Sequence, residues 1–146
     1  MPAIAEPDAA EVGPDNLVNL GPLRRKPGLH ISEADIVLQE IQLARAKNKR
    51  ALTEDMKKTM AYCKRFKQLQ NDVGASKAKE QLLRLVEYQA KFVKRCRDFE
   101  ATQLLNLMPA TAEEARKLIP TLETNIFLDE LIKELGPLKE FDRFIQ

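Results

Sequence analysis

Apolar residues from residue 34 onward recur at intervals of three and four, the spacing that places side chains along one face of an α-helix. The first such run contains Ala34, Val37, Leu38, Ile41 and Ala44. It follows Ser32, whose hydroxyl suits a helix N-cap, and Asp35 stands at the third helical position, as in a capping box. This pattern predicts a first helix over residues 33–44.

Two further helices are predicted in the middle of the chain. Thr53 can cap a helix that ends near Gly74 and whose apolar face consists of Met56, Met60, Cys63 and Phe66. Ser76 can open a third helix, whose apolar face is too wide for a single contact and consists of Ala78, Leu82, Leu83, Leu85, Val86, Ala90 and Val93. We therefore expect the third helix to pack on two neighbours.

The C-terminal third predicts three shorter helices. Asp98 can cap a helix over residues 99–108, and Thr111 with Glu114 forms the clearest capping box in the chain. A last helix over residues 128–135 is expected to stop at Gly136 and Pro137, and the apolar tail after it suggests docking on a surface. The predicted fold class is all-α, a small helical bundle.

The first 27 residues differ from the rest because they are interrupted by Pro2, Pro7, Pro14, Pro22 and Pro27. No long helix survives proline at that density, so residues 1–31 are interpreted as an extended arm and residues 32–146 as the helical domain. The densest apolar cluster in the arm is Leu17, Val18 and Leu20, which could add to the sheet edge of a partner or lie in its groove. The alternative is a disordered tail.

Charge is distributed unevenly. The formal net charge is +2, yet residues 45–98 hold 16 bases and 6 acids, whereas both flanking thirds are acidic. This basic middle favours an anion-facing surface with salt-sensitive, unspecific nucleic-acid contact, for which the candidates are Lys47, Lys49, Arg50, Lys94, Arg95 and Arg97. The alternative is a solvated helix face, supported by acid-first pairs four residues apart: Glu54 with Lys58, Glu80 with Arg84, and Glu87 with Lys91.

Residues for catalysis are scarce. His30 is the only histidine, Cys63 and Cys96 lack further metal-ligand partners, and no nucleophile elbow, phosphate loop or dinucleotide fingerprint is present. We expect no enzyme activity, no metal and no cofactor, and we expect both cysteines to be buried as small apolar residues. The first 15 residues contain no Lys or Arg, which argues against a secretory or mitochondrial leader and favours the cytosol or nucleus.

Two runs near the C-terminus are more specific than any helix pattern. Residues 99–109 read Phe-Glu-Ala-Thr-Gln-Leu-Leu-Asn-Leu-Met-Pro, and residues 111–120 read Thr-Ala-Glu-Glu-Ala-Arg-Lys-Leu-Ile-Pro. Together they resemble the signature of the family that contains the fourth subunit of eukaryotic RNA polymerase II and its counterpart in archaeal RNA polymerase. Looser similarities cover most of the remaining chain, whereas residues 75–97 are longer and more basic than is usual in that family.

The resemblance implies a non-catalytic nuclear subunit with a part similar to the HRDC fold over about residues 76–136. Such a subunit pairs with the seventh polymerase subunit as a stalk beside the RNA exit channel, supports initiation and offers a docking surface for other factors. The residues expected to meet that partner are Leu17, Val18, Leu20, Val37 and Ile41. Two alternatives stay open: the paralogous stalk subunit of RNA polymerase III, and a free-standing basic nucleic-acid adaptor.

Overall fold

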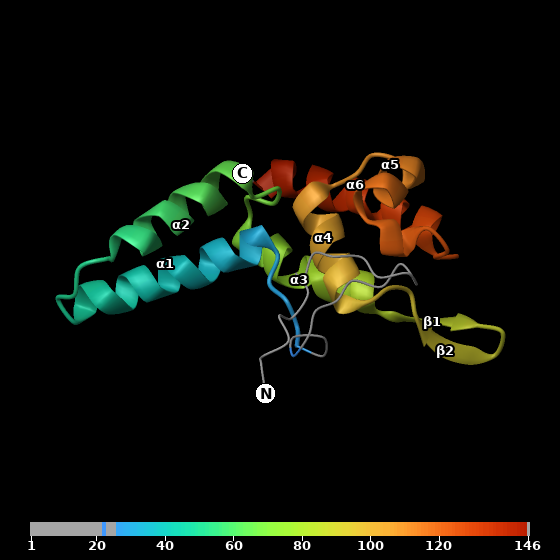
Figure 1. Ribbon diagram of the computed structural model, residues 1–146, viewed down its shortest axis with the longest axis horizontal. Helices are drawn as coiled ribbons and strands as arrows, with labels where there is room; N and C mark the ends of the chain where they lie inside the picture. Colours follow the sequence, from blue (N-terminus) through green and yellow to red (C-terminus); the bar gives the residue numbers. More distant parts are fainter. Residues whose placement is uncertain (1–21, 23–25, 146) are drawn as a thin grey trace, which may run out of the picture.

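The computed structural model describes residue 22 and residues 26–145, and this part of the chain is mostly helical. Its helices are α1 (Ile31–Lys47), α2 (Glu54–Phe66), α3 (Asp72–Leu83), α4 (Asp98–Leu107), α5 (Ala112–Leu118), the short 3-10 helix η2 (Pro120–Leu122) and α6 (Leu128–Ile145). Two strands, β1 (Leu85–Tyr88) and β2 (Lys91–Lys94), lie between α3 and α4 (Figure 1). The predicted helical fold class is confirmed, with one small β-element that was not expected.

Helices α3 to α6 enclose the hydrophobic core. Its fully buried leucines come from α3, α4, α6 and η2. They are Leu82, Leu104, Leu105, Leu122, Leu128 and Leu131. Ala78, Ala101 and Ala115 are equally buried, and their small side chains let the helices approach closely. Because full burial of a leucine contributes about 1.5–3 kcal/mol, this bundle is the main source of stability.

Helices α1 and α2 form an antiparallel pair that extends away from the bundle (Figure 1). The buried apolar side chains of α2 are Met60 and Cys63, and the fully buried residues of α1 are the polar Ser32 and Asp35. Both helices lie largely outside the core cluster, to which α1 adds only the half-buried Ile36. The α1–α2 pair therefore has a thin apolar contact of its own.

Polar contacts fix the base of α1 to the bundle. His30 is the N-cap of α1, and its Nε2 donates to the carbonyl oxygen of Ala75 in α3 at 2.9 Å. The Ser32 hydroxyl accepts from the backbone N–H of Leu69 at 3.1 Å, so the predicted N-cap role of Ser32 is wrong. Asp35 pairs with Lys67 at 2.9 Å, which holds the end of α2 against α1.

A β-hairpin occupies the stretch that we expected to continue the third helix. Helix α3 ends at Leu83, and β1 pairs with β2 in antiparallel register, with Val86 opposite Val93 and Tyr88 opposite Lys91. The turn residues Gln89 and Ala90 have φ of 49° and 60°, the left-handed conformation at both central positions of a type I′ turn. The helical prediction for residues 84–93 was wrong because β-branched and aromatic residues prefer the pleated strand there.

Helix α6 does not stop at Gly136 and Pro137 as predicted, but continues through Pro137 to Ile145. The added turns are held by Asp142, which is 4% exposed and whose carboxylate accepts the backbone N–H groups of Gln70 and Asn71. Leu138, which was expected in a docking tail, packs on the core instead. These tertiary contacts outweigh the cost of a proline inside a helix, which is about 3 kcal/mol.

The remaining helix ends show which local signals were reliable. The Thr53 hydroxyl accepts from the Met56 amide at 3.2 Å, and the Thr111 hydroxyl accepts from the Glu114 amide at 3.1 Å, which confirms both predicted caps. Helix α2, however, ends at Phe66 and not near Gly74, which lies inside α3.

The cap of α4 is shifted by one residue. Arg97 is its N-cap, and Asp98 is instead the first helical residue. The Asp98 carboxylate accepts from the Gly28 amide at 2.8 Å and pairs with Lys79 at 2.8 Å. Asp98 thus fixes the chain that enters α1 to the start of α4.

Candidate partner interface

Helix α1 carries an apolar stripe on the side that faces away from its buried residues. Ala34, Val37, Ile41 and Ala44 follow one another at intervals of three, four and three, so they share one face of the helix. Val37 and Ile41 keep 38% and 39% of their surface exposed. We call these four residues the α1 stripe, and no described residue covers it fully.

The opposite side of α1 explains why the stripe faces outward. Asp35 is completely buried there, where it pairs with Lys67 and accepts from the Gln39 side chain at 2.8 Å. A buried carboxylate that has these partners fixes the rotation of the helix, because turning it outward would leave Lys67 without its ion pair. Val37 and Ile41, which the sequence predicted as partner contacts, are thereby brought together on the free face.

Helix α2 adds exposed aromatic side chains. Tyr62 and Phe66 stack with their ring centroids 4.7 Å apart, and the guanidinium of Arg65 lies 5.2 Å from the centre of the Phe66 ring. The sequence placed Phe66 on the buried face with Met60 and Cys63, but its side chain is 44% exposed. The α1–α2 pair thus exposes apolar surface on both helices.

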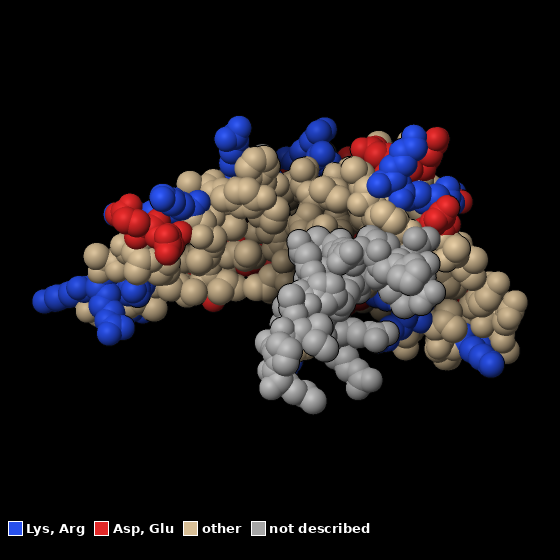
Figure 2. All heavy atoms as spheres, viewed as in Figure 1, with Lys and Arg blue, Asp and Glu red and all other residues tan. Residues whose placement is uncertain are grey.

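The basic residues of the middle third do not form one surface. Lys47 ends α1 and is followed by Lys49 and Arg50 in the turn before α2, at one end of the molecule. Lys94 ends β2 and Arg97 caps α4, toward the other end (Figure 1). The space-filling view shows Lys and Arg at both ends of the molecule and also along its upper edge, interspersed with Asp and Glu (Figure 2). The exposed basic residues named as candidates for nucleic-acid contact are therefore divided into two clusters.

Arg95, predicted to contact nucleic acid, is instead buried. Its side chain is 0% exposed, its Nη2 donates to the Gln81 carbonyl oxygen at 2.7 Å, and the same atom lies 2.8 Å from Glu134 Oε2. Glu130, one turn earlier on α6, lies 3.5 Å from Nη1. These two acids of α6 pair with the buried guanidinium of Arg95. The prediction that Arg95 contacts nucleic-acid phosphates is therefore wrong.

The charge pairs predicted within single helices are also rearranged. Lys57, and not Lys58, pairs with Glu54 at 3.2 Å, and Arg84 pairs with Glu134 of α6 at 2.7 Å. Glu87 and Lys91 lie on the two strands and have no helical relation. Because α3 ends at Leu83, neither Glu80 with Arg84 nor Glu87 with Lys91 forms a pair on a solvated helix face.

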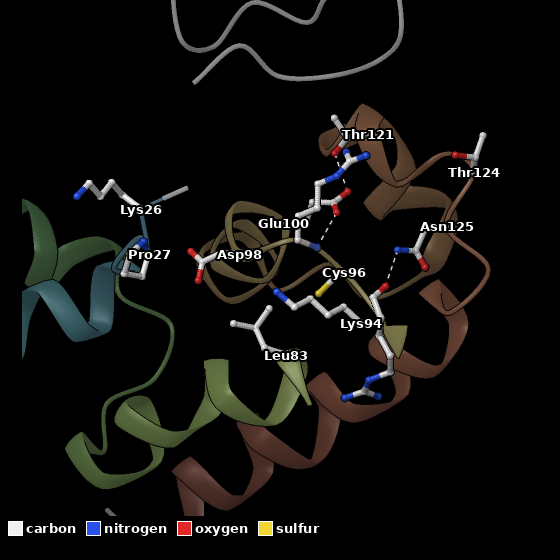
Figure 3. Close-up of a pocket in the computed structure, with 12 residues that line it drawn as sticks. Lys26, Pro27, Leu83, Lys94, Cys96, Asp98, Glu100, Thr121, Thr124 and Asn125 are labelled. Carbon is white, nitrogen blue, oxygen red and sulfur yellow. Dashed lines mark hydrogen bonds between the residues drawn. The ribbon is translucent and has the colours of Figure 1, made fainter. Parts of the chain in front are cut away.

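A cavity of about 650 Å³ lies where the hairpin joins α4 and η2 (Figure 3). Inside it the buried Glu100 accepts from the Thr121 hydroxyl at 2.8 Å and from the Arg97 amide at 2.9 Å. Burial raises the pKa of the Cys96 thiol to about 12, with the nearby Glu100 carboxylate adding to the effect, so the thiol stays protonated and unreactive. The polar groups of the cavity thus hold η2 against α4.

The other candidate groups have structural surroundings. Cys63 and Cys96 are both buried and free, as predicted. In the described part of the chain no three His, Cys, Asp or Glu side chains come close enough to hold a metal ion, and no helix has the length and hydropathy of a membrane span. Leu17, Val18 and Leu20 of the predicted arm lie outside the described residues.

The fold and the α1 stripe together define a helical assembly subunit, whose exposed apolar helix face is suited to contact another protein. The family model of RNA polymerase Rpb4 matches residues 28–139. The chain is also 34% identical over 146 residues to the DNA-directed RNA polymerase II subunit rpb4 of Schizosaccharomyces pombe, an alignment that covers 95% of this chain and 96% of that protein.

The chain therefore belongs to the RNA polymerase Rpb4 family. This confirms the resemblance to the fourth subunit of RNA polymerase II. Because members of the family are non-catalytic subunits of an RNA polymerase, it also confirms the prediction that the chain is not an enzyme.

Proposed function

We propose that this chain pairs with the seventh subunit of RNA polymerase II and forms with it a stalk near the RNA exit channel. The observation that carries the proposal is the α1 stripe, a line of apolar side chains that faces away from the core. A helix with apolar residues on two opposite sides is typical of an element that is buried between two bodies. Here α2 and α3 supply one body, and the seventh subunit supplies the other.

The thin packing of the α1–α2 pair supports the same proposal. The pair buries few apolar side chains of its own, while Val37, Ile41, Tyr62 and Phe66 are between 38% and 55% exposed. Interfaces between permanent partners resemble a domain core cut in half, with apolar residues at their centre. An exposed apolar pair of helices on a stable bundle fits one half of such a core.

The arm supplies the second proposed contact. Leu17, Val18 and Leu20 form the densest apolar cluster before α1, and an extended segment can bind by adding to a partner's sheet edge. In this proposal the arm and the α1 stripe bind the same seventh subunit. The arm and α1 then each contribute to the affinity of the chain for the seventh subunit.

The helix contact is tested by titrating the seventh subunit into purified variants of the chain and measuring the heat of binding. Ile41→Asp is expected to weaken binding at least 30-fold, because burial of an unpaired carboxylate costs about 2 kcal/mol or more. Leu43→Asp is the matched control, since Leu43 is 67% exposed and lies off the stripe. Equal affinity of the Ile41→Asp variant and the unchanged chain would remove α1 from the interface.

The arm contact is tested separately, by changing Leu17, Val18 and Leu20 together to Ser. We expect a loss of about tenfold or more in affinity, because three apolar side chains lose their burial. The described fold should be unchanged, which circular dichroism can verify. Unaltered binding heat and affinity would show that the arm has another role.

We further propose that the chain acts in the nucleus as part of the polymerase II assembly and not in that of polymerase III. The name of the fission yeast relative supports this assignment. A tagged chain purified from its native cell should recover the large subunits of polymerase II. Recovery of polymerase III subunits instead would assign the chain to the paralogous assembly.

A further inference from the structure

The β-hairpin presents one face largely to solvent, and Lys94 at the base of that face also lines the cavity. Leu85, Glu87, Phe92 and Lys94 point to the same side of the two strands, because Leu85 pairs with Lys94 and Glu87 with Phe92. Phe92 is 74% exposed and Leu85 is 54% exposed. The other face packs inward, with Val86 and Val93 half-buried.

The inner face also anchors the hairpin to the body of the protein. Tyr88 meets Phe127, just before α6, edge to face, with the ring centroids 5.5 Å apart. The exposed apolar residues are thus held on a fixed platform and are not carried by a loose loop. An exposed phenylalanine on such a platform indicates a binding surface more strongly than a single exposed side chain does.

The outer edge of β2 has free backbone groups. A two-residue turn makes Tyr88 and Lys91 a hydrogen-bonded pair, so the N–H and C=O groups of Phe92 and Lys94 point away from β1. Within the described part of the chain, no residue bonds to these groups. Such an edge is a template for another strand.

The charge around this edge is positive. Lys91, Lys94 and Arg97 have no ion pair with any described residue, whereas Arg84 pairs with Glu134, and Arg95 pairs with Glu130 and Glu134. Glu87 is the one acid between residues 81 and 97. It lies directly opposite Phe92. A peptide main chain can pair with the free N–H and C=O groups of β2, which a nucleic-acid backbone cannot do, so the surface favours an acidic peptide over a nucleic acid.

We propose that the edge of β2 binds an extended acidic segment of a partner protein, which adds a third strand to the hairpin. An apolar residue of that segment lies opposite Phe92, and an acidic residue two positions away lies opposite Lys94. Main-chain hydrogen bonds supply affinity, and the alternate side chains supply specificity. This site lies on the hairpin, away from the α1 stripe (Figure 1).

The proposal is tested with a fluorescein-labelled octapeptide, Asp-Glu-Val-Ile-Asp-Glu-Val-Ile, titrated with the full chain while anisotropy is measured. We expect saturable binding that Phe92→Ser and Lys94→Glu each weaken about tenfold, the usual size of a well-placed interface contact. A peptide with lysine in place of every acid should not bind. Absence of saturable binding by the acidic peptide would overturn the proposal.

Strand addition itself is tested by a matched pair, Lys94→Pro and Lys94→Ser. Both remove the cation, but only proline removes the outward N–H, and proline is tolerated on an edge strand. The proline variant should bind at least about fivefold more weakly than the serine variant, since one main-chain hydrogen bond contributes about 1 kcal/mol. Equal affinities would exclude strand addition.

Two further measurements complete the design. Gln89→Asn with Ala90→Gly gives the turn the residues that type I′ geometry favours, so the edge is better organised and the peptide should bind more tightly. This variant also guards against misfolding, because it strengthens the hairpin instead of disrupting it. A labelled uridine octamer is titrated in parallel, and tighter binding of that RNA than of the peptide, lost in the Phe92→Ser variant, would assign the surface to nucleic acid and overturn the proposal.

Discussion

The α3–α6 bundle and the α1–α2 pair use similar apolar residues in opposite ways. In the bundle, Leu104 and Leu131 are fully buried, and their neighbours come from other helices of the same chain. In the α1–α2 pair, Val37, Ile41 and Phe66 remain 38–44% exposed. The bundle therefore completes its own core, whereas the pair leaves apolar surface for another protein.

The polar contacts show the same division. Buried charged residues of the bundle pair with other residues of the bundle, as Arg95 does with Glu134. At the base of α1, His30 and Ser32 instead fix the helix to Ala75 of α3 and to Leu69 just before α3. Asp35 ties α1 to the end of α2 and sets the rotation of α1. Stability and binding are thus assigned to different parts of the chain and can be altered separately.

The largest effect on stability is expected when the charge contacts of the bundle are broken. Arg95→Ala should lower the free energy of unfolding by about 3–5 kcal/mol, because it removes the buried partner of Glu134 and the donor to the Gln81 carbonyl. Urea denaturation followed by circular dichroism measures this loss. Arg95→Met fills the same space without a charge and is expected to be less harmful. A change below about 1 kcal/mol in the alanine variant would contradict the structural role of Arg95.

The next largest effect on stability is expected when the apolar core of the bundle loses a side chain. Leu104→Ala is expected to lower the free energy of unfolding by about 2–5 kcal/mol, since the side chain is 0% exposed and its loss leaves a cavity. The same denaturation experiment applies. A loss under about 1 kcal/mol would mean that the bundle collapses around the gap and is less rigidly packed than the buried leucines indicate.

The sequence predicted the helical class and two of the helix caps because capping chemistry is local, whereas Ser32, Ser76 and Asp98 do not cap the helices assigned to them. Thr53 and Thr111 each satisfy an amide three residues ahead, whatever the rest of the fold does. It also named Val37 and Ile41 as partner contacts, on the resemblance to the family, and the helical spacing placed both on one face of the first helix.

The errors involve contacts between distant segments. Arg95 looked like a surface cation until α6 placed Glu130 and Glu134 beside it, and Pro137 looked like a helix stop until Asp142 reached the amides of Gln70 and Asn71. The hairpin was missed because its turn, Gln89 and Ala90, contains neither Gly nor Asn, the residues that normally signal it. A single sequence does not show such long-range partners.

A smaller effect on stability is expected from the protonation of His30, which lies where the α1–α2 pair joins the bundle. Burial lowers the pKa of His30 below its ordinary value, with Lys79 acting in the same direction and the Ala75 carbonyl and Glu33 opposing. Below about pH 6.5 the unfolded chain binds a proton that the folded chain does not, so stability should fall as the pH drops from 7.5 to 5.5. His30→Gln should remove this part of the pH dependence. A variant that keeps the full slope would place its origin in another group.

The smallest effect is expected on the α1 stripe of the free chain. Ile41→Ala removes a side chain that is 39% exposed, so only part of its roughly 2 kcal/mol of burial energy is lost. Alanine has a better helix propensity than isoleucine, which returns a few tenths of a kcal/mol. The free energy of unfolding should therefore change by less than about 1 kcal/mol, well below the loss for Leu104→Ala. In the complex with the seventh subunit the same change should weaken binding, and a variant that loses stability alone but keeps its affinity would reverse the roles assigned to the two regions.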